Sequence, residues 1–325
     1  MTDLYNGTSP QTYMNRHKRP YAIVAFARLM RRAFAELSKN DPLRLAGATA
    51  FFTTFALPPI LVILIQTLGL IFDPNNIRQQ LFLKLSGLIG RESVQQIINT
   101  LKAFRQMAQN WYITIGGFIF LMFVATTLFK VIKSSLNQLW KVKVVKKRGM
   151  WSRLRTRFNA ILVILVAGIL FVIGLVAEGV QAYMGRYIFE ISPLLALYFN
   201  TIINHLLSVI MVTLWFAMVF RLLPDARPQW HIALSGAFFT SILFNIGKLV
   251  LRWLLTYPNI NTIYGASGSI VLLLLFVFYS SFILYYGAAF TKVWAAHKKA
   301  PIRPRPYAMH YQLAEVSEDD KIVST

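Results

Sequence analysis

Residues 245–289 read NIGKLVLRWLLTYPNINTIYGASGSIVLLLLFVFYSSFILYYGAA, and this stretch decides the fold. Apolar residues dominate both of its ends, and the turn-forming sequence Tyr-Pro-Asn-Ile-Asn occupies 257–261 between them. Two membrane-spanning helices joined by a short loop account for this pattern, because a helix needs about 20 apolar residues to cross a bilayer. Lys248 and Arg252 require a further explanation, since charged side chains are costly inside a membrane.

The composition of the whole chain agrees with a membrane protein. Hydrophobic residues make up 56% of the 325 residues, and the mean hydropathy is +0.52. Charged residues make up only 14%, whereas soluble domains contain about 25%. The sequence has no cysteine, which excludes disulfides and thiolate metal sites.

Long apolar runs predict an all-α polytopic membrane protein with six transmembrane helices. The segment before the first run is polar and basic, and that run is too long for a cleavable signal peptide, so we expect it to be retained. The transmembrane domain is predicted to cover residues 45–296. The expected crossings are 43–72, 111 to about 129, 158–180, 197–220, 230–255 and 265–294.

The first crossing contains the pair Pro58-Pro59 near its middle. Proline lacks an amide donor and disfavours helical geometry in the preceding residue, so the helix is predicted to be broken near Leu57. Broken helices recur at transporter binding sites, where the freed backbone groups face a cavity. The alternative is a simple proline kink in a continuous helix.

Three segments flank or interrupt the crossings. Residues 1–44 form an N-terminal segment with an amphipathic helix over 21–37, which either lies on the inner leaflet or packs against the protein itself. Residues 73–110 are predicted to form two amphipathic helices that cap the outer side of the membrane. Residues 297–325 are rich in proline and charge and are predicted to be a disordered tail.

The distribution of positive charge predicts the orientation. Lysine and arginine number 26 in residues 1–44, 130–157, 221–231 and 292–325, against 6 in the segments on the opposite side. By the positive-inside rule both termini are cytoplasmic, as in a multi-pass protein of a bacterial inner membrane.

Four short sequences carry a resemblance to a known family. They are ATAFF at 48–52 ahead of the proline pair, LNQLW at 136–140, RLLPD at 221–225 and IYGASGS at 263–269. The chain resembles the YihY/BrkB family of bacterial inner-membrane proteins, which includes YhjD-like members and was formerly labelled ribonuclease BN. The resemblance implies a six-helix membrane protein of the cell envelope. The family has been labelled a ribonuclease, a virulence or serum-resistance factor and a candidate envelope-lipid transporter.

Some motif residues have simple structural interpretations. Family members often end the last crossing with Gly-Ala-Glu, whereas this chain has Gly-Ala-Ala at 287–289, so any role of that acid is absent or moved. Trp140 is interpreted as an interface anchor, and Asn137 as a cap or an interhelical hydrogen bond. Gly265 and Gly268 follow Tyr264 within four residues, and these small residues indicate close helix packing.

Catalysis is not expected from this sequence. The five histidines lack ligand-like spacing, the acids number only 12, and no phosphate-binding loop of the Gly-x4-Gly-Lys type is present. We therefore expect no enzyme activity, no metal and no cofactor. The basic run 141–157 is expected of a cytoplasmic loop beside a crossing, which disfavours a nucleic-acid partner and a ribonuclease function.

A candidate binding site lies on the fifth crossing. Asn245, Lys248 and Arg252 share one helical face, which should point into the bundle. Glu178 is expected at the same depth as Arg252 and is predicted to contact it. Membrane lipids are then partners, and the leading hypothesis is a transporter or flippase of an anionic amphiphile, lipid or organic solute. The alternatives are a structural or regulatory envelope protein, and a Lys248 bonded to carbonyls of the first helix.

Overall fold

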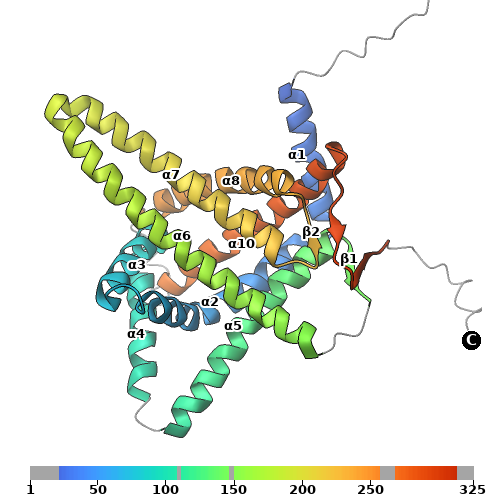
Figure 1. Ribbon diagram of the computed structural model, residues 1–325, viewed down its shortest axis with the longest axis horizontal. Coiled ribbons are helices and arrows are strands. Elements are labelled where there is room, and N and C mark those ends of the chain that lie inside the picture. Colours follow the sequence, from blue (N-terminus) through green and yellow to red (C-terminus); the bar gives the residue numbers. More distant parts are fainter. Residues whose placement is uncertain (1–21, 108–110, 146–149, 257–267, 313–325) are drawn as a thin grey trace, which may run out of the picture.

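The computed structural model describes residues 22–107, 111–145, 150–256 and 268–312 (Figure 1). In these ranges nine helices and four short strands follow one another along the chain. The helices are α1 (Ala22–Ser38), α2 (Pro42–Leu68), α3 (Pro74–Ile89), α4 (Arg91–Met107), α5 (Trp111–Leu139), α6 (Met150–Ile191), α7 (Pro193–Leu222), α8 (Trp230–Thr256) and α10 (Gly268–His297). The strands are β1 (Val142–Val144), β2 (Ala226–Arg227), β3 (Arg303–Pro304) and β4 (Ala308–His310).

Five of the described helices are long and apolar enough to cross a membrane. Their apolar stretches are Pro42–Leu68, Leu162–Ile191, Pro193–Leu222, Trp230–Leu251 and Ile270–His297. These five stretches confirm the predicted class, an all-α polytopic membrane protein. α5 occupies the position of the predicted second crossing and has 29 residues, so its length of about 44 Å exceeds the thickness of a hydrocarbon core. The count of six crossings stays a prediction.

The path of α2 corrects the predicted break in the first crossing. Its helical backbone runs without interruption from Pro42 to Leu68, with Pro58 and Pro59 inside it. Both prolines are buried, and α2 packs along α5 and α10. Each proline removes one backbone donor, and packing on neighbouring helices can hold the rest of a transmembrane helix together. The alternative of prolines within a continuous helix is therefore the one observed.

A close contact between α8 and α10 lies at the centre of the bundle. A Cβ atom on Gly236 of α8 would lie 1.9 Å from Thr291 Oγ1, and a Cβ atom on Gly287 of α10 would lie 1.8 Å from Thr240 Oγ1. Each threonine hydroxyl donates to the carbonyl of the glycine four residues earlier in its own helix, at 2.7 Å. Small residues let membrane helices approach closely in this way, and here the two Gly-x3-Thr pairs interlock.

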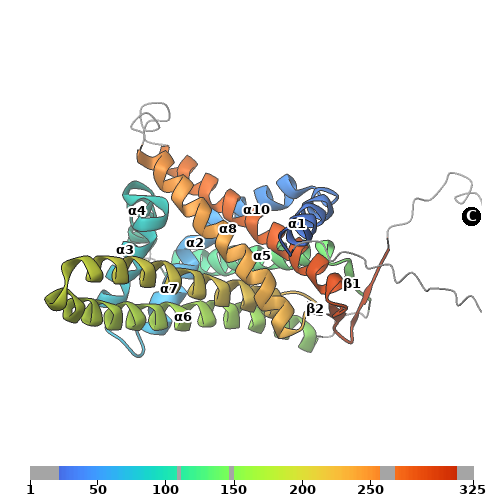
Figure 2. The same ribbon diagram turned by 90° about the horizontal axis from the view of Figure 1, so that it is seen from above.

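α6 and α7 form a long antiparallel hairpin that extends beyond the other helices (Figures 1 and 2). They contain 42 and 30 residues, or about 63 and 45 Å of helix, and both exceed the predicted crossings. The hairpin exposes large apolar side chains along its length, as a lipid-facing surface does. They include Ile169, Ile173, Val176, Val180, Leu194, Leu195, Ile202 and Leu206.

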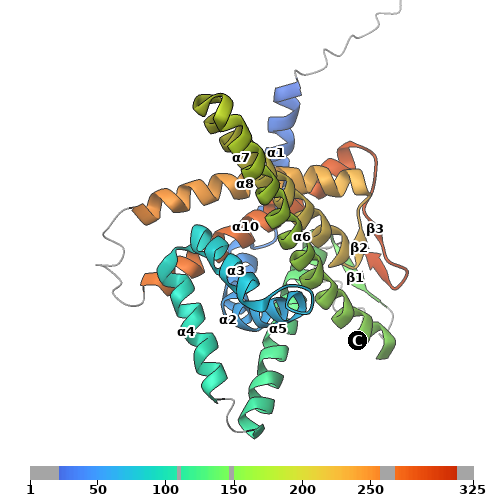
Figure 3. The same cartoon turned by 60° about the vertical axis from the view of Figure 1, so that its left-hand side comes forward.

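The predicted amphipathic helices are present. α1 buries Leu29, Ala33 and Leu37, and its Met30 carbonyl accepts a hydrogen bond from Tyr286 Oη of α10 at 3.1 Å. α1 therefore packs against the protein itself, the second of the two alternatives. α3 and α4 contact each other, α2 and α10 (Figure 3), so this segment contains two helices as predicted, and its position on the outer side of the membrane stays a prediction.

The C-terminal segment corrects the prediction of a disordered tail. β3 pairs with β2 and β4 pairs with β1, both antiparallel, so residues 303–310 hold the α7–α8 connection and the segment after α5. Ile302 belongs to the main core cluster. The alternation of proline and charge was interpreted as disorder, yet proline is compatible with short edge strands of this kind. The predicted tail beyond residue 312 lies outside the described residues.

Candidate functional site

Lys248 lies on the side of α8 that faces α7. Its ammonium donates to the Ser208 hydroxyl of α7 at 2.7 Å, and that hydroxyl donates to Asn245 Oδ1 at 2.9 Å. The Asn245 amide in turn donates to the Ser241 carbonyl at 2.8 Å. Asn245 and Lys248 thus share a face turned into the bundle, as expected. The hydroxyl at the ammonium comes from α7, and the alternative contact with carbonyls of the first helix stays a prediction.

A polar cavity of about 470 Å³ lies between α6 and α7, toward the tip of their hairpin. Its polar lining consists of Glu178, Gln181, Arg186, Asn200 and Asn204. Gln181 is only 7% exposed, and its amide donates to the Asn200 carbonyl at 3.1 Å. The Gln181 Oε1 atom is buried without a hydrogen-bond partner. An unsatisfied buried acceptor is costly, and this one belongs to a residue that lines the cavity.

The cavity and the Lys248 cluster follow one another along α7. Asn200, Asn204 and Ser208 are spaced by four residues, which places them one above another on a single helical face. Each step along this face is about 6 Å. We call the set Asn200, Asn204, Ser208, Asn245 and Lys248 the α7 track. It carries amide, hydroxyl and ammonium groups through a hairpin whose outer surface is apolar.

Glu178 has a partner that was not predicted. Its carboxylate forms an ion pair with Lys84 of α3, a residue of the cap. The two side chains are 47% and 34% exposed, so the pair stabilises the fold only weakly. The side chain of Arg252 lies outside the described residues, and its contact with Glu178 stays a prediction.

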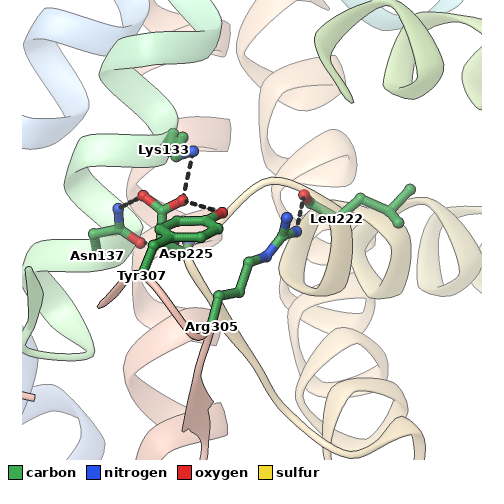
Figure 4. A network of polar contacts seen from close by, with 6 residues as sticks. All are labelled: Lys133, Asn137, Leu222, Asp225, Arg305 and Tyr307. Atoms are coloured by element: carbon green, nitrogen blue, oxygen red, sulfur yellow. Dashed lines mark hydrogen bonds and ion pairs between the residues drawn. The ribbon is translucent and has the colours of Figure 1, made fainter. Parts of the chain in front are cut away.

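A second polar cluster lies at the other end of α7 and surrounds Asp225, which is 1% exposed (Figure 4). Lys133 Nζ of α5 lies 2.7 Å from Asp225 Oδ1, and Asn137 Nδ2 donates to Oδ2 at 2.8 Å. Asn137 Oδ1 accepts from the Asp225 amide at 2.8 Å. The interhelical hydrogen bond suggested for Asn137 is therefore a two-way contact with the connection after α7.

The C-terminal segment completes the Asp225 cluster. Tyr307 Oη donates to Asp225 Oδ1 at 3.0 Å, and the Arg305 amide donates to the Asp225 carbonyl at 2.8 Å. Burial raises the pKa of the Tyr307 phenol, and the nearby negative charge of Asp225 raises it further. The phenol thus stays protonated and remains a donor. Arg305 also donates from its guanidinium to the Leu222 carbonyl at 3.1 Å.

Asp225 was quoted in a family motif but was not selected as a site residue. The only signal in the sequence was the spacing of Lys133 and Asn137, which puts a cation and an amide on one face of α5. That spacing does not identify a partner 88 residues away. Within the described residues no group of three His, Asp or Glu side chains could hold a metal ion.

The position of Trp140 corrects its interpretation as an interface anchor. It is 1% exposed and donates from its indole nitrogen to the Ala288 carbonyl of α10 at 3.0 Å, so it is a core residue rather than an interface anchor. A buried tryptophan needs a partner for its N–H, and the carbonyl supplies one. Tyr264 and Gly265 lie outside the described residues, and Gly268 begins α10.

The arrangement of this bundle can be compared with known proteins. The model of a family described as virulence factor BrkB matches residues 33–311. The chain belongs to this family. The match covers α2 to α10 and both polar clusters, so the α7 track and the Asp225 cluster lie within the part that defines a BrkB protein.

Curated relatives of this BrkB protein are described as UPF0761 membrane proteins. One from Chlorobium phaeobacteroides is 28% identical over 75% of this chain and 55% of its own length. One from Pseudomonas paraeruginosa is 25% identical over 82% and 61%, and one from Psychromonas ingrahamii is 27% identical over 78% and 83%. The chain thus spans less than two thirds of the length of the first two. No solved structure matches.

Proposed function

We propose that this BrkB protein moves an anionic amphiphile or organic solute across the membrane, with the α7 track as its path. The observation that carries the proposal is Lys248 Nζ, held at 2.7 Å from Ser208 one helical turn beyond the cavity residue Asn204. A lysine in a membrane segment costs about 3 kcal/mol on insertion scales, and such residues mark substrate pathways.

The chemistry of the track favours an anionic group as cargo. Lys248, Arg186 and the amide groups of Asn200 and Asn204 are donors to a phosphate or carboxylate. The apolar outer surface of the α6–α7 hairpin would let acyl chains stay in lipid while a headgroup follows the track. The proposed role is translocation, and it requires no catalytic residue. Membrane lipids are the partners that it implies.

The direct test uses vesicles that contain the purified protein and a labelled anionic lipid or solute. The wild type should accelerate movement between the leaflets, and Lys248→Met should abolish most of that acceleration while the protein still inserts and folds. Lys102→Met is the matched control, because Lys102 is an exposed lysine on α4 away from the track. Equal rates for Lys248→Met and the wild type would exclude the track as the path.

A protein without transport activity is the competing outcome of this test. If the wild type moves neither anionic lipids nor anionic solutes in any vesicle, a structural or regulatory role in the envelope is favoured. In that case Ser208→Ala and Lys248→Met should change the melting temperature of the protein, since their hydrogen bond would then serve the fold alone.

A further inference from the structure

A second cavity, of about 770 Å³, lies at the end of the bundle where the C-terminal segment packs. Its walls come from the α7–α8 connection and from β3 with the residues that follow it. Four arginines line this cavity together with Trp230 and Tyr307. The arginines are Arg221, Arg227, Arg303 and Arg305. We call this cavity the arginine cavity. Arg221 lies 21 residues after Asn200 on α7, so the arginine cavity is about 30 Å along that helix from the cavity near the tip of the α6–α7 hairpin.

Among the residues that the structure describes, the positive charge of the arginine cavity is not balanced by its lining. None of the described residues that line it is an Asp or a Glu. Asp225 lies nearby, but its carboxylate is 1% exposed and already contacts Lys133, Asn137 and Tyr307. An opening lined by several arginines without a lining carboxylate is the arrangement that attracts anions.

Two features of the arginines disfavour the empty cavity. Arg227 and Arg303 are direct partners in the antiparallel pair of β2 and β3, and like charges opposite one another destabilise a strand pair. Arg305 is 8% exposed, and its Nε atom is buried without a hydrogen-bond partner. A buried, unsatisfied donor on a charged group is costly. An anion in the cavity would screen the facing charges of Arg227 and Arg303 from each other.

Other features hold the donors in place for a ligand. The Arg221 guanidinium lies 4.2 Å from the centre of the Trp230 ring and donates to the Pro228 carbonyl. Pro228 and Gln229 precede α8 and Trp230 begins it, so this wall lies at the N-terminus of the helix, where the helix dipole favours an anion. Guanidinium groups match the geometry of phosphate oxygens by paired hydrogen bonds.

We propose that the arginine cavity binds a phosphate-bearing anion with at least two negative charges. The cavity is larger than a single phosphate and within the range of small-molecule sites, so the ligand carries more than one phosphate or an organic group besides. Such a group is present on soluble phosphorylated compounds and on the headgroups of anionic lipids. Binding joins Arg221 and Arg227 of the bundle to Arg303 and Arg305 of the C-terminal segment, and so stabilises their association.

The test uses the full chain in nanodiscs of phosphatidylcholine, with inorganic pyrophosphate as the soluble probe and calorimetry as the readout. Pyrophosphate should bind the wild type and raise its melting temperature. The double variant Arg227→Gln/Arg303→Gln should bind at least about tenfold more weakly. The matched control is Arg31→Gln/Arg32→Gln, which removes the same charge from exposed positions of α1 and should bind like the wild type.

A second set of discs identifies the source of the phosphate. These discs include phosphatidic acid, whose headgroup is a phosphomonoester. If a lipid headgroup occupies the cavity, phosphatidic acid should block pyrophosphate in the wild type and raise the melting temperature only when Arg227 and Arg303 are present. If the ligand is soluble, pyrophosphate should bind equally in both kinds of disc.

Stability without ligand separates a binding role from a structural one. Removal of one of the facing charges should leave the unliganded Arg303→Gln variant at least as stable as the wild type. The proposal is overturned if neither probe binds in a manner that depends on these arginines. It is also overturned if the variant melts lower than the wild type without ligand but binds pyrophosphate with unchanged affinity.

Discussion

The two ends of α7 use polar residues in opposite ways. Around Asp225 every oxygen of the carboxylate has a partner, the partners come from α5 and the C-terminal segment, and the group is almost fully buried. Along the α7 track the polar groups are half-buried or exposed, and they adjoin a cavity whose lining residue Gln181 has a buried acceptor without a partner.

This difference separates polar residues that hold the fold from those available to a ligand. A buried charge pair with a full set of hydrogen bonds is strongly destabilised when one member is removed. Removal of the charge of a half-buried lysine should cost the fold little, because the change also removes the cost of keeping the charge in a membrane. The two ends should therefore respond differently to the loss of a charge.

The largest loss of stability is expected from Asp225→Asn. This change leaves the Lys133 ammonium buried without its carboxylate, and such losses are about 3–5 kcal/mol. Glu190→Gln makes the same chemical change at an exposed position of α6 and should have little effect. Thermal unfolding of both variants in the same detergent measures the difference, and equal melting temperatures would remove the distinction between the two ends.

A smaller loss is expected where packing rather than charge is changed. Gly287→Ala would place a methyl group 1.8 Å from Thr240 Oγ1, so α8 and α10 must separate, at about 1–3 kcal/mol. Gly174→Ala on α6 is the control, because a Cβ atom there meets no atom within 4 Å. The prediction is wrong if both alanine variants unfold at the same temperature.

A pH-dependent contribution is expected from the ion pair of α1 with α10. Burial alone would raise the pKa of Glu36, but the hydrogen bond and positive charge of Lys292 outweigh it and leave the pKa below the usual 4.5. Protons therefore bind the unfolded state more readily. The pair stabilises the fold above pH 4.5, and this stabilisation is lost as the pH falls through the lowered pKa.

The melting temperatures of the wild type and Glu36→Gln measure this effect. They should differ near neutral pH, and the difference should shrink as the solution is acidified. A difference that stays constant with pH would mean that the carboxylate charge of Glu36 does not contribute.

The smallest change in stability is expected on the α7 track. Lys248→Met should shift the free energy of unfolding by less than about 1 kcal/mol, because the lost hydrogen bond to Ser208 is offset by the removal of an intramembrane charge. The same thermal measurement, made beside Asp225→Asn, gives the comparison directly. A loss as large as that of Asp225→Asn would assign Lys248 a structural role.

The sequence predicts those parts of the fold that depend on local pattern. Apolar runs indicate the membrane helices, and the spacing of apolar residues indicates α1 and the two cap helices, because periodicity follows from helix geometry. The predicted break of the first crossing at Pro58 and Pro59 was wrong, because packing on α5 and α10 overrides the local preference of proline. The interpretation of Trp140 as an interface anchor was wrong, because no local pattern distinguishes a core tryptophan from an interfacial one.

The candidate sites were less predictable because they depend on pairing across the chain. Helical spacing predicted the face of α8 on which Lys248 lies, but its partner Ser208 lies 40 residues away on α7. The arginine cavity was missed because its walls come from two segments, and the second of them, residues 303–307, had been interpreted as disordered. Strand pairs of two and three residues leave too short a pattern to be recognised in the sequence.

The pairing of β3 and β4 also has a consequence for biosynthesis. The ribosome makes all of the described helices before it makes residues 303–310, so these helices can enter the membrane while β1 and β2 still lack their partners. Tyr307 reaches Asp225 only after that, and among the partners Lys133, Asn137 and Tyr307 it is the last to be synthesised. Closure of this end of the bundle therefore requires that translation has passed α10, and a chain that stops before Tyr307 would leave the Asp225 carboxylate without that hydrogen bond.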